Sequence, residues 1–174
     1  SENMSIVGIT GTNGKTSTCQ LITHLIQKNG LLCGSLGTLG FSTPSGIIST
    51  GFTTPESIEL QQILKTISNG GIEYVPMEIS SHAIELYRVN NVDVDIAIFT
   101  NLGYDHLDFH KTQENYFNSK LKLFTNLKRE SIAILNYDDE RTEKITENII
   151  CNFETLVEVH PHMHLDSYPY LRPV

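Results

Sequence analysis

The chain has 174 residues, a length that suits one domain with a sizeable buried core. Its hydrophobic fraction is 39%, and no apolar run approaches the roughly 20 residues that span a bilayer, so we expect no membrane partner. The formal net charge of −8 argues against a nucleic-acid partner, although a local nest of amides can still bind an anionic small molecule. The three cysteines form no CxxC pair, so we predict neither a disulfide framework nor a zinc site and expect a cytoplasmic monomer.

Strand and helix signals alternate along most of the chain. The predicted strands are 5–9, 32–40, 74–80, 95–101 and 131–136, and the predicted helices are 15–28, 56–68, 113–128 and 138–149. The stretch 43–46 (TPSG) predicts the turn of a hairpin. This alternation predicts an α/β fold with a mostly parallel sheet flanked by helices. Residues 151–174 lose the rhythm, so we divide the chain into a domain at 1–150 and a tail at 151–174 that forms loop or edge strand.

Prolines and apolar spacing refine these predictions. Pro55 suits the first position of helix 56–68. One interpretation of Thr53 and Thr54 is that they are turn residues ahead of this helix, with Thr54 as its N-cap. Pro76 weakens the prediction of strand 74–80, because proline removes an N–H group from a sheet ladder. In helix 15–28 one face carries a set of large apolar residues, namely Leu21, Ile22, Leu25 and Ile26.

The stretch GITGTNGKTS (8–17) joins the first predicted strand to the first predicted helix. Glycines let backbone N–H groups turn toward an anion, and the helix N-terminus adds its dipole. We therefore predict a phosphate-binding loop in which a lysine reaches the nucleotide phosphates and a hydroxyl ligates Mg²⁺. Its residues are Gly11, Thr12, Asn13, Gly14, Lys15, Thr16 and Ser17. The strict pattern GxxxxGK[ST] is not met because Ile9 stands at its first glycine, so a Gly-rich turn with an exposed lysine is the alternative.

Helix 113–128 carries a lysine where an apolar residue is expected. At 100° per residue, Lys120 falls about 40° from Tyr116, inside the apolar arc, whereas Lys122 falls at about 240° on the polar side. A lysine on a buried face is unfavourable unless it is paired. The alternative is that the side chain extends along its stem to solvent.

A carboxylate and an imidazole follow two other predicted strands. Glu78 stands near the end of strand 74–80, and His106 follows strand 95–101. Because the carboxyl ends of parallel strands face the ligand crevice, we expect both to lie near Thr16 and the phosphates. The alternatives are a solvated strand end for Glu78 and a helix-start or packing role for His106.

Several stretches resemble the Mur ligase family, whose members add amino acids to the bacterial cell-wall precursor. The matching stretches are TGTNGKT (10–16), NLGYDHLDFH (101–110), YFNSK (116–120) and LNYDD (135–139). The resemblance runs from about residue 6 to about residue 149 and implies the P-loop NTPase-like central domain of that family. Two further stretches, FTTPES (52–57) and MEISSHAIELYRV (77–89), resemble the branch that adds the third peptide residue to UDP-N-acetylmuramoyl-L-alanyl-D-glutamate.

The resemblance also implies site roles, with ATP and Mg²⁺ as cofactors. It implies that Lys120 is carbamylated and helps to hold a second Mg²⁺, that Glu78 bridges the metal ions, that His106 ligates the second and that Asn136 faces the adenine. Carbamylation would turn an ammonium group into an oxygen ligand of the kind Mg²⁺ prefers. The residues implied to contact the muramoyl-peptide substrate are Thr53, Thr54, Ser80 and Arg88.

The implied reaction is ATP-dependent amide-bond formation. ATP phosphorylates the D-glutamate side-chain carboxylate, and the amine of a diamino acid or lysine then displaces phosphate. One alternative is a nucleotide-binding module that is inactive as an isolated chain, because the sequence lacks counterparts of the flanking domains that hold the uridine diphosphate and the amino acid. The other is a folylpolyglutamate synthetase-like ligase, against which SSHAIELYRV (80–89) argues. A metal site at His160, His162 and His164 is a further option that no family segment matches.

Overall fold

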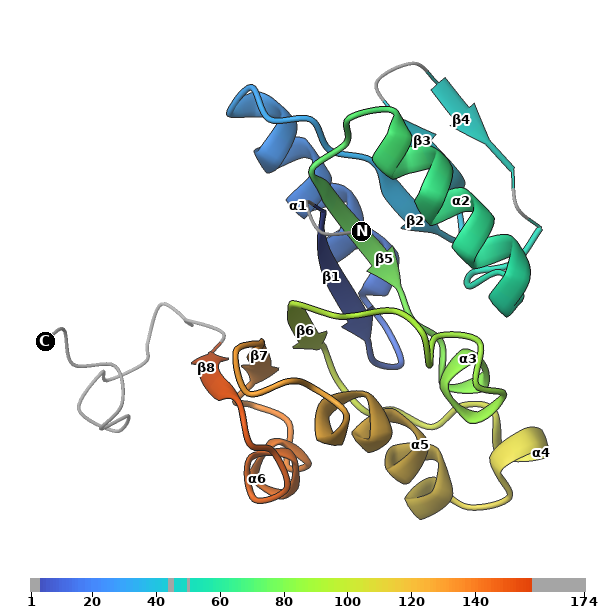
Figure 1. Ribbon diagram of the computed structural model, residues 1–174. Coiled ribbons are helices and arrows are strands. Elements are labelled where there is room, and N and C mark those ends of the chain that lie inside the picture. Colours follow the sequence, from blue (N-terminus) through green and yellow to red (C-terminus); the bar gives the residue numbers. More distant parts are fainter. Residues whose placement is uncertain (1–3, 44–45, 50, 158–174) are drawn as a thin grey trace, which may run out of the picture.

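Strand β1 lies inside the sheet and pairs in parallel with β5 on one side and β6 on the other. In this computed structural model (Figure 1), which describes residues 4–43, 46–49 and 51–157, the sheet order is β4-β3-β2-β5-β1-β6-β7-β8. The strands are β1 (Ser5–Thr10), β2 (Ser35–Gly37), β3 (Gly40–Thr43), β4 (Gly46–Ile48), β5 (Tyr74–Glu78), β6 (Ile96–Phe99), β7 (Ile132–Asn136) and β8 (Asn152–Leu156). The helices are α1 (Lys15–Lys28), α2 (Ser57–Asn69), α3 (Ser81–Glu85), α4 (Leu107–His110), α5 (Gln113–Thr125) and α6 (Thr142–Thr146).

The predicted α/β fold with a mostly parallel sheet is confirmed. Only the hairpin strands run against the rest, since β3 pairs antiparallel with both β2 and β4. Of the turn predicted at 43–46, residues 44–45 lie outside the described residues. At the other edge, residues 152–156 form strand β8 beside β7, which is the edge-strand alternative for that region. Residues 158–174, with His160, His162 and His164, lie outside the described residues.

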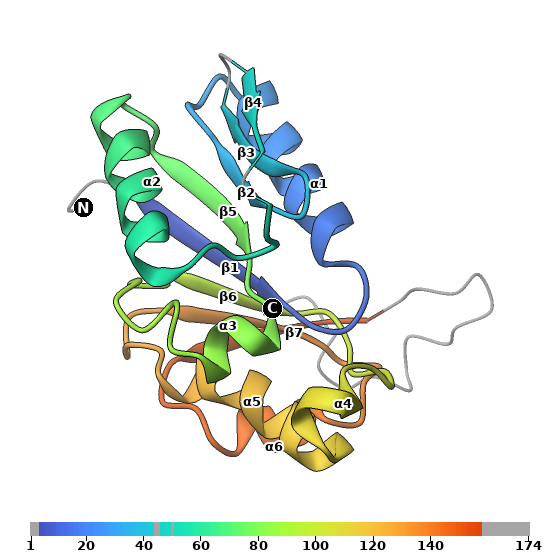
Figure 2. The same cartoon turned by 90° about the vertical axis from the view of Figure 1, so that its right-hand side faces the viewer.

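Helices cover both faces of the sheet, and β1 supplies side chains to each. Ile6 packs in the larger core with α2, α3 and α5, whereas Val7 and Ile9 pack with Cys19 of α1 on the opposite face. Figure 2 shows α1 on one side of the sheet and α2, α3 and α5 on the other. Because successive strand residues point to opposite faces, the part of a strand that is covered on both sides must be apolar at every position, as IVGI (6–9) is.

Pro76 lies within β5, an interior strand, although the sequence made a strand there doubtful. Its neighbour β2 pairs with β5 only at Leu36↔Met77 and through the isolated bridge Cys33↔Tyr74. Pro76 therefore falls in a gap of the β2–β5 ladder, where a missing N–H group breaks no pairing. On the other side Pro76 keeps its register with Val7 of β1.

The apolar face predicted for α1 is only partly in contact with the sheet. Cys19 and Thr23 are buried, while Leu21 and Leu25 remain 60% and 55% exposed. The helix therefore contacts the sheet through Cys19 and Thr23, and Leu21 and Leu25 lie outside this contact. Among the described residues no helix is both long enough and apolar enough to cross a bilayer.

Two predictions at the start of α2 were wrong. The helix begins at Ser57 with Glu56 in the N-cap position, so Pro55 precedes the helix instead of opening it. Thr54 does not cap the helix, because its hydroxyl is buried and bonds to the end of β5. The Thr54 hydroxyl therefore makes tertiary hydrogen bonds and does not cap α2.

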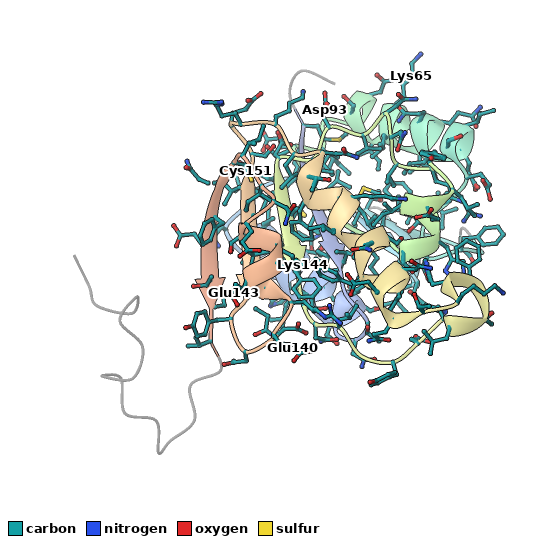
Figure 3. All side chains as sticks on the ribbon, turned by 90° about the horizontal axis from the view of Figure 1, so that it is seen from below. Lys65, Asp93, Glu140, Glu143, Lys144 and Cys151 are labelled. Atoms are coloured by element: carbon teal, nitrogen blue, oxygen red, sulfur yellow. The ribbon has the colours of Figure 1, made fainter. Side chains whose placement is uncertain are left out.

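Helix α6 lies between β7 and β8 in the chain and contacts α5 through ion pairs. Its Lys144 makes an ion pair with Glu114 of α5, which Arg141 also contacts at 2.9 Å. Figure 3 shows Lys144 on the side of α6 that faces α5 and Glu143 on the side toward β8. The helix predicted at 138–149 is confirmed only for its middle, residues 142–146.

Candidate nucleotide and acceptor site

The loop after β1 has a backbone that requires glycine at two positions. Gly11 has φ of 148°, and a Cβ atom there would lie 1.9 Å from Oγ1 of Thr100. Gly14 has φ of 84° and occupies the N-cap position of α1. These values are strained for residues with side chains. The predicted strand–loop–helix arrangement is therefore confirmed, and Ile9 explains the departure from the strict pattern, because it is a fully buried residue of β1.

The end of β6 holds this loop in place. The backbone N–H of Thr12 donates to the carbonyl of Asn101 over 2.8 Å, and that of Asn13 donates to the Asn101 side chain over 3.0 Å. The hydroxyl of Thr100 donates to the carbonyl of Asn13 over 2.7 Å. Sequence reasoning did not single out Thr100 or connect Asn101 with the loop. Polar residues directly after a buried strand are the signal that pointed there.

Lys15 opens α1 and folds back over the loop. Its Nζ atom donates to the carbonyls of Gly11 and Thr12, over 3.0 and 2.8 Å. Burial lowers the pKa of Lys15, and the charges of Glu78 and Asp105 act in the opposite direction. No acidic residue stands in the first turn of α1, so the positive helix end is not neutralised there. Ser17 is exposed in the same turn.

Glu78 ends β5 with its side chain 1% exposed, so the alternative of a solvated strand end was wrong. One carboxylate oxygen, Oε2, accepts from the hydroxyls of Thr16 at 2.9 Å and Thr38 at 3.2 Å. The other, Oε1, accepts from the backbone N–H of Thr38 at 2.8 Å. The convergence of Thr16 and Glu78 was predicted, and Thr38 was missed. The signal for Thr38 was a polar residue after a Gly-rich strand.

Lys120 is 2% exposed, so its side chain does not extend to solvent. Its Nζ atom donates to the carbonyl of Gly11 over 2.9 Å and lies 4.4 Å from the ring centre of Tyr116. Burial, with a smaller contribution from the nearby charge of Lys15, lowers the pKa of Lys120 to about 7, and the charge of Asp105 acts in the opposite direction. Lys122 is on the polar face as predicted and pairs with Glu85 at 2.7 Å.

His106 lies at the start of α4 among aromatic rings. It has φ of 51°, its Nε2 atom lies 3.4 Å from the Asp105 carboxylate, and its ring centre is 6.0 Å from that of Tyr116. His82 packs against it, with 4.8 Å between ring centres. Buried His110 shares a hydrogen bond of 3.0 Å with the Ser81 hydroxyl. Within the described part of the chain, no hydrogen bond or ion pair joins His106 to Glu78.

The four residues expected to contact a muramoyl peptide gather beside the end of β5. The Thr54 hydroxyl donates to the Glu78 carbonyl over 2.9 Å and accepts from the Ser80 backbone over 3.2 Å. Thr53 shares a 3.1 Å hydrogen bond with the Thr38 hydroxyl. Ser80 caps α3 by accepting from Ala83. All of these hydroxyls therefore have partners within the protein.

Arg88 reaches the same region from the loop after α3. Its guanidinium pairs with Glu56 at 2.5 Å, donates to the carbonyl of Thr54 over 3.3 Å and lies 5.8 Å from the ring centre of Phe52. The Nε atom is buried and has no hydrogen-bond partner among the residues that the structure describes. The side chain is 16% exposed, so Arg88 is not a solvent-exposed surface residue.

Asn136 ends β7 and is held by two hydrogen bonds. Its Nδ2 atom donates to the carbonyl of Thr100 over 2.7 Å, and its Oδ1 atom accepts from the backbone of Asp138 over 3.0 Å. It therefore lies next to the strand end that holds the phosphate loop. Its role toward an adenine stays a prediction.

A parallel sheet with a glycine loop, a helix N-terminus, a lysine and a buried carboxylate at one edge defines a nucleotide-binding α/β domain of the phosphate-loop class. Residues 9–162 match the family model of the Mur ligase middle domain. The chain belongs to the Mur ligase family.

A curated relative from Clostridium perfringens, UDP-N-acetylmuramoyl-L-alanyl-D-glutamate–2,6-diaminopimelate ligase, is 43% identical over 148 residues. That match covers 85% of this chain and 30% of the relative, so the chain spans about a third of such a protein. A solved structure with the same protein name has a TM-score of 0.80 at 31% identity and covers 91% of this chain and 33% of that one. E. coli FolC in complex with DHPP and ADP shares the fold, with a TM-score of 0.64 at 18% identity, over 91% of this chain and 45% of that one.

Proposed function

We propose that this chain is the central ATP-binding domain of a ligase that forms an amide bond on UDP-N-acetylmuramoyl-L-alanyl-D-glutamate, with a diamino acid or lysine as the amine. The observation that carries the proposal is the joining of two sites at the end of β5, where the Glu78 side chain bonds to Thr16 of the phosphate loop and its carbonyl bonds to Thr54. The name of the C. perfringens relative supports the acceptor.

The residues of this chain would act mainly by positioning and electrostatics. The loop amides and the N-terminus of α1 would bind the nucleotide phosphates, and Lys15 would leave its backbone partners to stabilise charge on the transferred phosphoryl group. Arg88 would bind a carboxylate of the peptide through its guanidinium group, which already pairs with the carboxylate of Glu56. The acyl phosphate then reacts with the amine, and phosphate leaves as the amide bond forms.

The site also fits Mg²⁺, which would stabilise phosphate charge when bound. Glu78 and Thr16 offer hard oxygen ligands, and a carbamate on Lys120 would offer another. Within residues 4–43, 46–49 and 51–157 no three acidic, histidine or cysteine side chains gather closely enough to hold a metal by themselves. Mg²⁺ does not need such a cluster, because it usually binds one or two carboxylates together with substrate phosphates and water.

The proposal is tested by amide-forming turnover of the full-length ligase. ADP release should require both the UDP-linked dipeptide and an amine, and mass spectrometry should find a tripeptide product. ADP release driven by a folate substrate would instead support the folylpolyglutamate synthetase alternative. The isolated 174-residue chain is expected to bind nucleotide without turnover, because it spans only 30% of its C. perfringens relative.

A reducing, cytoplasmic setting goes with this proposal. All three cysteines, Cys19, Cys33 and Cys151, are free and buried. Burial raises the pKa of Cys19 to about 12 and that of Cys33 to about 11, so both thiols stay protonated and unreactive at neutral pH. We propose a monomer as well, in agreement with the expectation from the sequence.

A further inference from the structure

We propose that Thr38 is a positioning residue that couples the acceptor loop, defined as residues 52–57, to the carboxylate of Glu78. The inference rests on the proposed function, because it names how the acceptor and nucleotide sites communicate. Thr38 follows β2, whereas the acceptor loop precedes α2 and Glu78 ends β5. Three segments that are separate in the sequence therefore meet at one threonine side chain.

Thr38 donates a hydrogen bond to each oxygen of the Glu78 carboxylate. Its backbone N–H donates to Oε1 over 2.8 Å, and its hydroxyl donates to Oε2 over 3.2 Å. The approach is possible because residue 37 is glycine, since a Cβ atom at Gly37 would lie 2.1 Å from Oε1. Thr16 supplies the remaining contact, to Oε2 at 2.9 Å. Thr38 therefore sets the orientation in which Glu78 faces the phosphate loop.

The hydrogen count fixes the direction of the chain of hydroxyls. A carboxylate can only accept, so the single hydroxyl hydrogen of Thr38 goes to Glu78. In the 3.1 Å contact between Thr38 and Thr53, the donor must then be Thr53. Each hydroxyl polarises the next, and the outer end presents the oxygen lone pairs of Thr53. A ligand that binds there is expected to offer an N–H or O–H donor, such as an amide of the acceptor peptide.

A second connection ties the acceptor loop to the same strand end. The hydroxyl of buried Thr54 donates to the backbone carbonyl of Glu78 over 2.9 Å and accepts from Ser80 over 3.2 Å. Thr54 holds the loop against the backbone, while Thr53 and Thr38 connect it to the side chain. A ligand that orders the acceptor loop would therefore order Glu78 too. By linkage, nucleotide and acceptor must then raise each other's affinity by the same factor.

The test measures that factor in the full-length ligase. Calorimetry gives the affinity for a non-hydrolysable ATP analogue with Mg²⁺, with and without the UDP-linked dipeptide, and the ratio is the coupling factor. Couplings of this kind are roughly 5- to 150-fold. Thr38→Val keeps the backbone N–H bond to Oε1 but breaks the hydroxyl chain, so the factor should fall close to 1. Thr38→Ser restores the hydroxyl and should restore the factor.

Two further variants complete the design. Thr66→Val removes a hydroxyl that bonds only within α2, and it should leave the factor at its wild-type value. Thr53→Val breaks the chain at its outer end without touching Glu78, and it should also bring the factor close to 1, even if Thr38→Val fails to fold. Thr38→Val and Thr53→Val combined should lower the factor no further than either alone, because both break one chain.

The outcomes separate this inference from the proposed function. A wild-type protein that binds the analogue but not the dipeptide would overturn the proposed function, and the inference with it. A wild-type protein that binds both ligands without coupling would overturn the inference alone. The same holds if coupling in Thr38→Val or Thr53→Val equals that of wild type.

Discussion

Lys15 and Lys120 donate to the same backbone oxygen, the carbonyl of Gly11, over 3.0 and 2.9 Å. One lysine begins α1 and the other lies on α5, and the second is almost fully buried. Two amines at one carbonyl are unfavourable when both are charged. Burial and the charge of Lys15 lower the pKa of Lys120 to about 7, so we expect Lys120 to be the amine that loses its proton near neutral pH.

Lys120 should react with carbon dioxide. A neutral amine adds to the carbon of CO₂ and loses a proton, and near neutral pH a large part of Lys120 is neutral. With ¹³C-labelled bicarbonate, a carbamate signal is expected in the NMR spectrum of the wild-type chain. Lys120→Met should abolish it, and Lys122→Met, which removes an exposed lysine of the same helix, should keep it. A signal that survives in Lys120→Met would assign the carbamate elsewhere.

Deprotonation of Lys120 should contribute a rise in the stability of the chain with pH between about 7 and 10.5. In the unfolded chain the Lys120 amine holds its proton up to its ordinary pKa of 10.5, whereas in the folded chain it releases it near 7. The unfolded state thus binds more protons in this window, so the free energy of unfolding increases with pH. Denaturant titrations in CO₂-free buffer should show that wild type gains a few kcal/mol relative to Lys120→Met across this window, at about 1.4 kcal/mol per pKa unit.

The variant comparison isolates that effect. Lys120→Met should lack this part of the rise, while Lys122→Met should keep it, because Lys122 is exposed beside Glu85. Equal slopes for wild type and Lys120→Met across pH 7 to 10.5 would mean that the buried amine is not the titrating group.

Lys15→Ala should weaken binding of a non-hydrolysable ATP analogue by about 10- to 100-fold, the range of a hydrogen bond to a charged group. The lysine Nζ must leave the carbonyls of Gly11 and Thr12 to reach a phosphate, so part of its interaction energy is already used in the free protein. Calorimetric titration of the 174-residue chain measures this. Lys28→Ala, at the far end of the same helix, is the matched control. An unchanged affinity in Lys15→Ala would remove the phosphate-loop assignment.

Gly37→Ala should disturb the site without a general loss of structure. The added methyl group would lie 2.1 Å from Oε1 of Glu78, so the carboxylate must move away from Thr16. We expect weaker Mg²⁺-dependent binding of the ATP analogue. Gly70→Ala, whose methyl group meets its nearest atom at 3.3 Å, should bind like wild type. If Gly37→Ala also binds like wild type, the position of Glu78 does not matter for the nucleotide.

The sequence predicted the elements whose pattern is local. Helix 15–28 agrees with α1 to the residue, and strand 5–9 agrees with β1 within one residue, because glycines, strand and helix stand next to one another in the chain. Short helices α3 and α4 were not predicted, since four or five residues are too few for a helical period to show. The predicted start of α2 was one residue too early. Thr54 does not cap this helix because its hydroxyl makes a tertiary hydrogen bond.

The sequence by itself predicted the strand–loop–helix segment at 5–28 and the apolar arc in which Lys120 stands, because both depend on spacing within one segment. It predicted the parallel sheet from the alternation of strands and helices along the chain. The tertiary structure alone decided which groups those residues meet. Lys120 finds Gly11 across 109 residues, and Thr38 finds Glu78 across 40. Such pairings arise when the strand ends are brought to one edge of the sheet, and no periodicity in the chain encodes them. For the same reason the burial of Glu78 and the lowered pKa of Lys120 belong to the fold and not to the local sequence.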